Sequence, residues 1–362
     1  MDSTRIEVTS ERGTYPVVIG PGASRQLGRL LAAAGIGRQR LVVSSAPIWH
    51  LHGSRLRQVA TTANPPALIQ DGERAKTLAT VSRLYDECVK RGLDRSAAIV
   101  SFGGGVVGDA SGFAAASYLR GISLVQVPTT LLSQVDSAIG GKVGVNLPAG
   151  KNLVGAFYSP ALVVCDPEVL RTLPPREFRA GLYEVVKYGV IASPALFRQL
   201  TTSLPAILGQ DLRLLTQLVA ACCRIKADVV MADEREGGPR RALNFGHTIG
   251  HALESISQYR RFRHGEAIAY GMLAAARLSV YRQSMAADDE RALQRLIANM
   301  GALPPVTDLK IADALEVIAR DKKVVGGRLH FVLAQGIGAT VVAADVHTRE
   351  LARAMAAIGM KR

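Results

Sequence analysis

The chain has 362 residues, of which 48% are hydrophobic and 20% are charged. This is the composition of a folded protein rather than a disordered one, and the length is sufficient for two domains. No apolar run reaches the roughly 18 residues of a membrane span, and the charged start MDSTRIEVTSERG lacks the apolar segment of a secretion signal. Four cysteines without CxxC spacing (Cys88, Cys165, Cys222 and Cys223) are expected to be buried thiols, so we expect a cytoplasmic protein.

The net charge of +14 raises the question of an acidic partner. Nucleic acid attracts basic chains, but here the basic residues are scattered, aromatic residues make up 5% of the chain, and no helix-turn-helix, RRM or zinc-finger pattern occurs. We therefore expect neither a nucleic-acid nor a membrane partner. A small anionic substrate explains the charge equally well, and the charge alone does not decide between these classes.

In the first half of the chain, short β-branched runs alternate with helical stretches such as residues 77–92. This rhythm predicts an α/β domain with a largely parallel sheet over residues 1–175. The expected strands are residues 5–10, 15–20, 40–45, 96–105, 123–130 and 161–167.

Pro174 and Pro175 interrupt any regular element, and helical periodicity dominates after them. We predict a second, mostly α-helical domain over residues 176–362, with a site in a cleft between the two domains. A hairpin is expected where LHFVLA and ATVVAA flank QGIG. The expected helices are residues 177–192, 211–231, 246–257, 264–283, 287–299 and 346–358.

A glycine-rich turn follows the predicted strand that ends near residue 103. Gly103, Gly105 and Gly108 satisfy G-x-G-x-x-G between a strand and a small-residue helix, which is typical of pyrophosphate binding. The acidic residue that usually follows about 20 residues later is missing, because Gln126 and Pro128 occupy that region. The pattern favours a nucleotide bound in a variant arrangement, and a tight structural turn is the alternative.

Residues 127–160 are polar and rich in glycine. Asp136, Lys142, Lys151 and Asn152 lie among these glycines, which suits a loop that wraps an anionic ligand. A surface loop without a ligand is the alternative, although loops of this length in compact domains are usually functional or disordered.

Histidines and acids occur on the predicted helices of the second half. His247 and His251 are four residues apart and therefore share a helical face. The zinc-protease motif has this spacing too, but it places a glutamate where this chain has Thr248. Glu184, His247 and His264 would form a two-histidine, one-carboxylate site of the catalytic-zinc type. The alternative is that these histidines are buried core residues that form hydrogen bonds and bind no metal. The spacing also leaves open whether His251 binds the metal.

Together these motifs resemble the 3-dehydroquinate synthase family. The resemblance implies a dehydroquinate synthase-like fold, with a Rossmann-like nucleotide-binding sheet in an α/β N-terminal domain and a mostly α-helical C-terminal domain. It also implies NAD, a zinc ion that cobalt can replace, and a homodimer. The matching stretches keep the family's order over residues 99–323 and are GGGVVGDASGFAAASYLRG, VPTTLLSQVDSAIGGKVGVN, GKNLVGAFY, EVVKYG, LNFGHTIGHALE, HGEAIAYGM and DKK.

The resemblance also implies roles for individual residues of this chain. Glu184, His247 and His264 match the metal ligands, so that His251 would serve the substrate instead. The residues expected to contact NAD are Glu73, Lys76, Gly105, Gly108, Asp109, Thr129, Thr130, Lys142 and Lys151.

Further positions match the family's substrate-binding residues. Lys226 and Arg240 resemble the pair that holds the substrate carboxylate. The expected phosphate pocket consists of Lys142, Asn152, Asn244, His251 and Lys322, with Arg120 contributed by the partner subunit. The expected catalytic group consists of His251 and Lys142, with Asp136, Lys187 and Glu236 around the substrate hydroxyls.

The chain departs from the family pattern at two places. Ser45 and Pro47 occupy the positions of the usual Asp-x-Asn that contacts the adenosine end of NAD, so we expect fewer contacts there. Pro239 and Arg241 replace the usual leucines, whereas Arg240 keeps its spacing of four before Asn244.

The resemblance implies conversion of 3-deoxy-D-arabino-heptulosonate 7-phosphate to 3-dehydroquinate and phosphate in the shikimate pathway of aromatic amino-acid biosynthesis. This NAD- and metal-dependent carbon–oxygen lyase reaction combines transient oxidation, phosphate elimination, re-reduction and aldol closure. Related cyclases, acting on sedoheptulose 7-phosphate or forming aminodehydroquinate, are the alternatives. The Lys226 and Arg240 pair argues against the first of these, because sedoheptulose 7-phosphate has no carboxylate.

Overall fold

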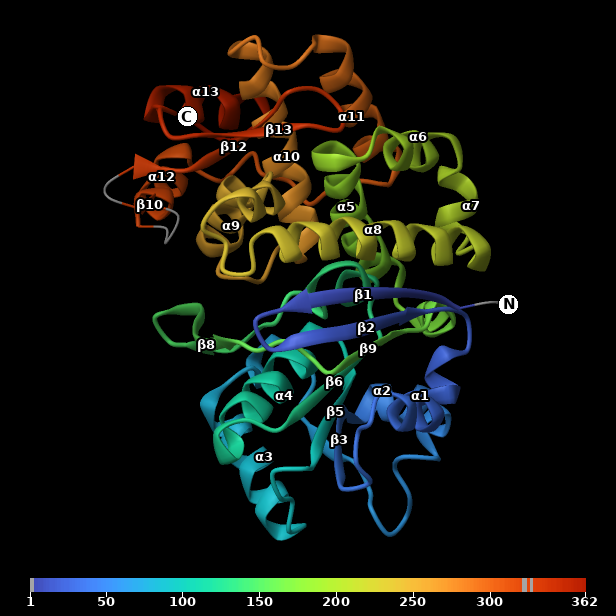
Figure 1. Cartoon of the computed structure of the whole chain (residues 1–362). Coiled ribbons are helices and arrows are strands. Elements are labelled where there is room, and N and C mark those ends of the chain that lie inside the picture. The colour runs from blue at the N-terminus through green and yellow to red at the C-terminus, as the bar shows by residue number, and fades with distance from the viewer. Residues whose placement is uncertain (1–2, 321–323, 326–327) are drawn as a thin grey trace. The chain divides into compact units, whose positions relative to one another are not determined.

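The computed structural model describes residues 3–320, 324–325 and 328–362, which form two compact units (Figure 1). Unit 1 comprises Met1–Pro174 and Leu212–Arg235, and unit 2 comprises Pro175–Asp211 and Glu236–Arg362. The chain therefore returns once to unit 1, through helix α8 (Leu212–Ala232), which packs against the first two strands. From the sequence, α8 was expected in the second domain, because periodicity identifies a helix but not the core that it joins.

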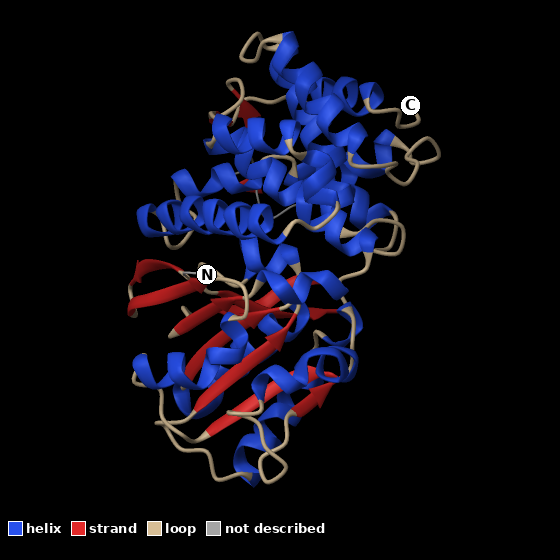
Figure 2. Ribbon diagram, turned by 90° about the vertical axis from the view of Figure 1, so that its right-hand side faces the viewer, coloured by secondary structure: helices blue, strands red, loops and turns tan. Residues whose placement is uncertain are grey.

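A seven-stranded sheet forms the centre of unit 1 (Figure 2). Its order is β1-β2-β9-β6-β5-β3-β4, with β1 and β2 antiparallel and the other neighbouring pairs parallel. The predicted largely parallel sheet is therefore confirmed, although β4 is too short to show a pattern and was not expected. The strands are β1 (Thr4–Ser10), β2 (Gly13–Ile19), β3 (Arg40–Ser45), β4 (Ala67–Ile69), β5 (Ala98–Gly103), β6 (Ser123–Pro128) and β9 (Leu162–Cys165).

Helices cover both faces of this sheet (Figure 1). Along β5, Ile99 faces the core that α3 and α4 cover, whereas Val100 and Phe102 face the core that α1 and α2 cover. A strand that is buried on both faces has no polar side, which explains the continuous apolar runs in the sequence. The helices are α1 (Leu27–Ala33), α2 (Ala46–His52), α3 (Leu78–Lys90) and α4 (Gly105–Ser117).

Residues 133–157 form mostly regular structure instead of the long loop that their glycines suggested. Ser133–Ser137 is a π-helical turn (η5), and β7 (Lys142–Leu147) pairs with β8 (Gly150–Phe157) in an antiparallel hairpin. Gly144 and Gly155 are opposite each other there, and a Cβ atom on Gly155 would lie 2.2 Å from the carbonyl oxygen of Val143. Glycines that permit this close approach hide the alternation that identifies a strand.

Unit 2 is mostly helical, as predicted, and the expected hairpin is present as β12 and β13. Helices α6, α7 and α12 were not expected, because five to nine residues give a weak periodic signal. None of the helices in the described ranges is long and apolar enough to cross a membrane. The elements are α5 (Pro175–Ala192), α6 (Pro194–Thr202), α7 (Leu204–Leu208), α9 (His247–Ile256), α10 (His264–Tyr281), α11 (Ala287–Asn299), α12 (Ile311–Ala319), β10 (Val324–Val325), β11 (Arg328–Leu329), β12 (Phe331–Ala334), β13 (Thr340–Ala343) and α13 (Thr348–Ala357).

The close packing of α10 depends on glycines. A Cβ atom on Gly271 would lie 1.8 Å from the carbonyl oxygen of Gly246, which is the N-cap of α9. A Cβ atom on Gly265 would lie 1.8 Å from the carbonyl oxygen of Ala180 in α5. No side chain fits at these distances, so α10 lies directly against the backbones of α9 and α5.

We expect Gly271→Ala to lower the free energy of unfolding by about 3 kcal/mol or more, because the new methyl group overlaps backbone rather than a movable side chain. Urea denaturation measures this change. Gly237→Ala is the matched control, because a Cβ atom there meets nothing within 4 Å. Equal unfolding midpoints for the two variants would contradict the packing described here.

Candidate functional site

Four side chains converge from three helices of unit 2. Glu184 lies in the middle of α5, His247 is the first residue of α9, His251 follows one turn later, and His264 is the first residue of α10. Each histidine offers a ring nitrogen, and the three nitrogens lie within 4.8 Å of one another. The glycine contacts of α10 bring these helices close enough for the side chains to meet.

The carboxylate of Glu184 is completely buried and lies between an ammonium group and two imidazoles. Its Oε2 is 2.5 Å from Nζ of Lys187, which follows at a spacing of three on the same helix. Its Oε1 is 3.5 Å from Nε2 of His264 and 3.7 Å from Nε2 of His247. The acid expected to bind a metal therefore faces both histidines that were expected to bind it.

Hydrogen bonds on the far side of the rings orient both of these histidines. Nδ1 of His247 lies 3.2 Å from the carbonyl oxygen of Phe245, and Nδ1 of His264 lies 3.2 Å from Oε2 of Glu254. When a ring is neutral and donates its Nδ1 proton in this way, its lone pair lies on Nε2, the nitrogen that faces Glu184. Metal-binding histidines commonly have such a second partner.

The carboxylates around His264 alter its titration. Burial lowers the pKa of His264, but the carboxylates of Glu254 and Glu184 outweigh burial and raise it to about 10. A metal ligand must be deprotonated, so metal binding would displace this proton. The cluster attracts positive charge, which is the electrostatic property of a cation site.

Imidazole nitrogens with a carboxylate oxygen form a donor set that suits zinc and related divalent metals. The structure brings the predicted ligands Glu184, His247 and His264 together. It also places His251 close to them, with ring centroids 5.3 Å from His247 and 5.8 Å from His264. The assignment of His251 to the substrate rather than to the metal therefore stays a prediction.

The glycine-rich turn joins β5 to α4 in unit 1. Gly103 ends β5, and Gly104 is the N-cap of α4, where it supplies no side chain to the amides of the first turn. A Cβ atom on Gly108 would lie 3.0 Å from Oε1 of Gln126, so this glycine permits the contact between α4 and β6. A helix of 13 residues that begins at Gly105 just after a strand, with no side chain capping its N-terminus, suits the pyrophosphate of a dinucleotide.

A polar network lies beside this turn. Lys76 is buried and donates to the carboxylate of Asp109 on α4 and to the amide oxygen of Asn152 on β8. Glu73 accepts a hydrogen bond from Asn146 at 2.7 Å. Burial raises the pKa of Asp109, and the charge of Lys76 opposes this rise. Three of the residues expected to bind NAD therefore meet in one network.

A second lysine of unit 1 also pairs with an acid. Lys226 of α8 donates to the carboxylate of Asp136 in η5. Thr129 and Thr130 lie between the end of β6 and η5. The backbone N–H of Thr129 donates to the carbonyl oxygen of Gly103, in the glycine-rich turn, at 2.9 Å. Lys226 belongs to unit 1 and Arg240 to unit 2, so their expected joint contact with a carboxylate stays a prediction.

Three other basic residues expected to bind ligands lie at or near the surface of unit 1. Lys142 begins β7 and is exposed, and Lys151 on β8 is half-buried. Arg120 is exposed and has a φ of 67°, a left-handed conformation that is uncommon outside glycine. An exposed guanidinium meets the requirement for a residue that serves a second subunit.

The remaining predicted substrate residues of unit 2 lie in the segment before α9. Asn244 donates to the carboxylate of Glu236, whose φ of 62° is also left-handed. Arg240, in the short helix η7 (Pro239–Asn244), is only 1% exposed and is the largest fully buried side chain described. Lys322, which was expected in the phosphate pocket, lies outside the described residues.

Two polar residues of these networks were not identified from the sequence. Glu254 follows His251 by three residues and shares its helical face, so an acid on the histidine face of α9 was the available signal. Asn146 lies in the hairpin that was mistaken for a loop, and its backbone N–H donates to the carbonyl oxygen of Lys76 at 2.9 Å. Without the strand pairing, the sequence gives no reason to select it.

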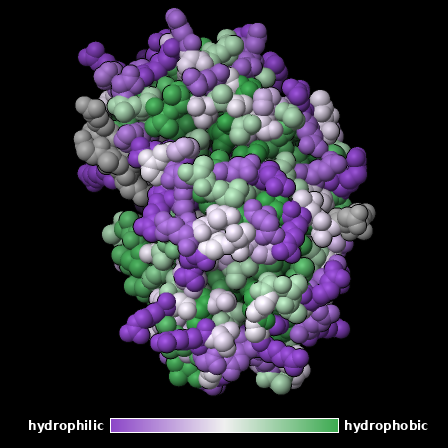
Figure 3. Space-filling model, viewed as in Figure 1, coloured by the Kyte–Doolittle hydropathy of each residue, from purple (hydrophilic) through white to green (hydrophobic). Residues whose placement is uncertain are grey.

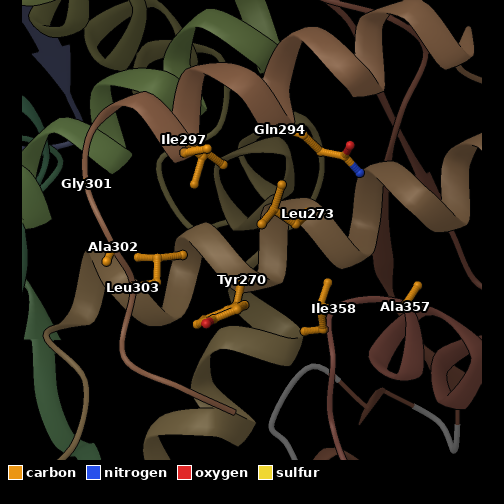
Figure 4. Close-up of a pocket in the computed structure, with 10 residues that line it drawn as sticks. Tyr270, Leu273, Gln294, Ile297, Gly301, Ala302, Leu303, Ala357 and Ile358 are labelled. Carbon is orange, nitrogen blue, oxygen red and sulfur yellow. The ribbon is translucent and has the colours of Figure 1, made fainter. Parts of the chain in front are cut away.

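A pocket of about 370 Å³ lies elsewhere in unit 2 (Figure 4). Tyr270 and Leu273 of α10, Gln294 and Ile297 of α11, and Ile358 after α13 surround it. Its lining is mostly apolar, and none of the described residues predicted to act in catalysis or binding lines it. This pocket is therefore not the site that the sequence predicts.

Family models match most of the chain. A model described as "3-dehydroquinate synthase N-terminal" matches residues 66–180, and one described as "3-dehydroquinate synthase C-terminal" matches residues 181–324. The chain is also similar to the 3-dehydroquinate synthase of Pelotomaculum thermopropionicum, with 46% identity over 93% of this chain and 92% of the relative.

Solved structures of other cyclases have the same fold. The 2-epi-5-epi-valiolone synthase of Streptomyces hygroscopicus subsp. jinggangensis, with NAD+ and Zn2+ bound, matches 98% of this chain and 99% of its own, with a TM-score of 0.85 and 27% identity. A 2-deoxy-scyllo-inosose synthase complexed with carbaglucose-6-phosphate, NAD+ and Co2+ matches 97% and 99%, with a TM-score of 0.82 and 28% identity. Each of these two proteins binds both a dinucleotide and a divalent metal.

We expect His247→Ala to lose bound metal and His251→Ala to retain it, because His247 belongs to the predicted ligand set, with its Nε2 3.7 Å from Oε1 of Glu184, whereas His251 is predicted to serve the substrate. Elemental analysis of the purified, zinc-loaded variants measures this difference. His50→Ala removes an exposed histidine of unit 1 and serves as the control. Equal metal loss in both cluster variants would make His251 a ligand as well.

Proposed function

Because this chain belongs to the 3-dehydroquinate synthase family, we propose that it converts 3-deoxy-D-arabino-heptulosonate 7-phosphate to 3-dehydroquinate and inorganic phosphate. The reaction is an NAD- and metal-dependent carbon–oxygen lyase step of the shikimate pathway, which leads to the aromatic amino acids. The observation that carries the proposal is the meeting of Glu184, His247 and His264 in a chain whose full-length relatives are 3-dehydroquinate synthases.

The residues that would hold the two cofactors follow from the networks described above. Glu184, His247 and His264 would hold the zinc or cobalt ion. The glycine turn, with Lys76 and Asp109 beside it, would hold NAD. When bound, NAD supplies reversible hydride transfer at one substrate carbon, and the metal polarises the neighbouring substrate oxygens.

Charged side chains of the chain would bind the two anionic ends of the substrate. Arg240 and Lys226 would hold the carboxylate, since a guanidinium pairs with a carboxylate in a bidentate manner. Lys142, Asn152, Asn244, His251 and Lys322 would surround the phosphate, with Arg120 from the partner subunit.

Residues near the substrate hydroxyls would control proton positions. Asp136, Lys187 and Glu236 would contact these hydroxyls, and each has a polar partner within the chain that it can exchange for the substrate. His251 and Lys142 would shape the environment of the phosphate, which itself can accept the proton removed from the adjacent carbon.

We propose that the active form is a cytoplasmic homodimer. Leu119 next to Arg120 is 41% exposed, and Leu153 and Phe157 of β8 are 54% and 45% exposed. Hydrophobic residues gather over the β7–β8 hairpin on the face seen in Figure 3. A second copy would cover such side chains, since large exposed apolar groups often mark interfaces.

The proposed cytoplasmic location is supported by the four cysteines, which are buried free thiols of the kind found in a reducing compartment.

We expect purified enzyme to release phosphate from 3-deoxy-D-arabino-heptulosonate 7-phosphate only with both NAD and a divalent metal, and without net NADH. A phosphate assay run with and without NAD, and after chelation, measures this dependence. Accumulation of NADH at 340 nm would indicate a dehydrogenase instead. Release from sedoheptulose 7-phosphate, but not from the carboxylated substrate, would indicate one of the related cyclases. Identification of the carbocyclic product distinguishes the formation of 3-dehydroquinate from the formation of aminodehydroquinate.

We expect Arg240→Ala to raise KM for the carboxylated substrate about 10- to 100-fold, because a hydrogen-bonded charge pair contributes roughly 1.5–3 kcal/mol. Initial rates over a substrate series measure KM and kcat separately. Arg240→Lys is the control variant. It keeps the buried positive charge but not the bidentate geometry, so it separates the effect of losing the charge from that of losing the guanidinium. An unchanged KM in a folded Ala variant would refute this role for Arg240.

A further inference from the structure

We infer that Glu254 is the positioning residue that holds His264 in its metal-binding orientation. The inference rests on the proposed function, because it concerns the metal centre described there. Oε2 of Glu254 lies 3.2 Å from Nδ1 of His264, and the Glu254 side chain is only 6% exposed. Neither the resemblance nor the comparisons assigned a role to this acid.

The helical spacing of α9 explains how Glu254 reaches His264. His247, His251 and Glu254 follow at intervals of four and three, so they occupy one face of the helix. Gly250 lies on the same helix, and a Cβ atom there would be 3.0 Å from the carbonyl oxygen of Ala267 in α10. This close approach brings the acid of α9 within hydrogen-bonding distance of the first residue of α10.

The contact determines which nitrogen of His264 is available. When metal binding displaces one proton from the ring, the proton that stays on Nδ1 and is donated to Glu254 leaves the lone pair on Nε2, the nitrogen that faces Oε1 of Glu184 at 3.5 Å. The charged partner also makes the imidazole a stronger base and therefore a stronger ligand. A neutral ring released from Glu254 could adopt the other tautomer or turn away.

The two predicted histidine ligands are oriented by different kinds of group. His247 has the carbonyl oxygen of Phe245 as its second partner, which no side-chain substitution removes. His264 has a carboxylate, which a single substitution removes. The chain therefore allows the orientation of one ligand to be tested while the other stays in place.

Glu266 provides a matched control. It is also buried, at 6% exposure, and lies two residues after His264 on the same helix. Its oxygens both accept from Arg176 at 2.7 Å, and Oε2 accepts from the backbone N–H of Arg263 at 2.8 Å. Loss of Glu266 therefore removes a buried carboxylate near His264 without removing the contact with Nδ1.

The test measures zinc affinity of the full-length chain by competition with a chromophoric chelator. We expect Kd to rise about 10-fold in Glu254→Gln, which keeps an acceptor but not the charge, and about 100-fold in Glu254→Ala. Glu266→Gln should lower the melting temperature but leave Kd within about threefold of the parent protein. The visible absorption of the cobalt-loaded protein should change in the Glu254 variants and not in Glu266→Gln.

The outcomes separate this inference from the proposed function. If the parent protein binds no zinc, the metal centre fails and the inference fails with it. If the parent binds zinc and both Glu254 variants match its Kd, only the inference is overturned. Equal weakening in Glu254→Gln and Glu266→Gln would also overturn it, because the effect would then be general loosening of the helices. Should Glu254→Ala fail to fold, Glu254→Gln decides alone.

Discussion

The buried carboxylate of Glu184 is the constraint on which the organisation of unit 2 depends. An isolated charge of this kind would cost several kcal/mol, on the order of the whole stability margin of a domain, so it must be compensated locally. Lys187 provides one positive charge through Oε2, and the imidazoles of His247 and His264 face Oε1. Since these partners come from three helices, the positions of α5, α9 and α10 are coupled to the chemistry of one side chain.

Glycines make this convergence possible, and they also limit how the chain can change. Gly265 and Gly271 allow α10 to approach the backbones of α5 and α9, where a methyl group would overlap a carbonyl oxygen. Direct backbone contact shortens the distance that ligand side chains must cover, so histidines can meet a glutamate from a neighbouring helix. The same contact leaves no free volume to absorb a larger residue, because packed interiors deform little. Precision at the site is therefore obtained from tight packing of the surrounding helices.

The difference between local and long-range information determines what could be predicted from the sequence. Strand β5 and helices α9 and α10 were predicted because their apolar spacing is visible within a few residues. The acid and the histidines that are predicted to bind the metal were selected because such polar residues are uncommon on apolar helices. The β7–β8 hairpin was missed, since Gly144 and Gly155 serve a cross-strand approach that has no local signature. The position of α8 in unit 1 and the contact of Glu254 with His264 depend on how helices pack against other elements, which the spacing within one helix does not show.

The chain pairs three of its buried lysines with its own acids, which bears on the origin of its high net charge. Lys76, Lys187 and Lys226 each contact an acid. The contacts of Lys76 with Asp109 and of Lys226 with Asp136 join separate segments of unit 1, and Lys187 contacts Glu184 within helix α5 of unit 2. These lysines therefore add little uncompensated charge, and exposed residues such as Lys142 and Arg120 contribute more to the field that an approaching anion meets. A sugar phosphate would be attracted by the surface charge first and would then have to compete with Glu184 for Lys187 and with Asp136 for Lys226. Such competition favours a ligand with several anionic and hydroxyl groups, because one weak acceptor could not replace the carboxylates that it displaces.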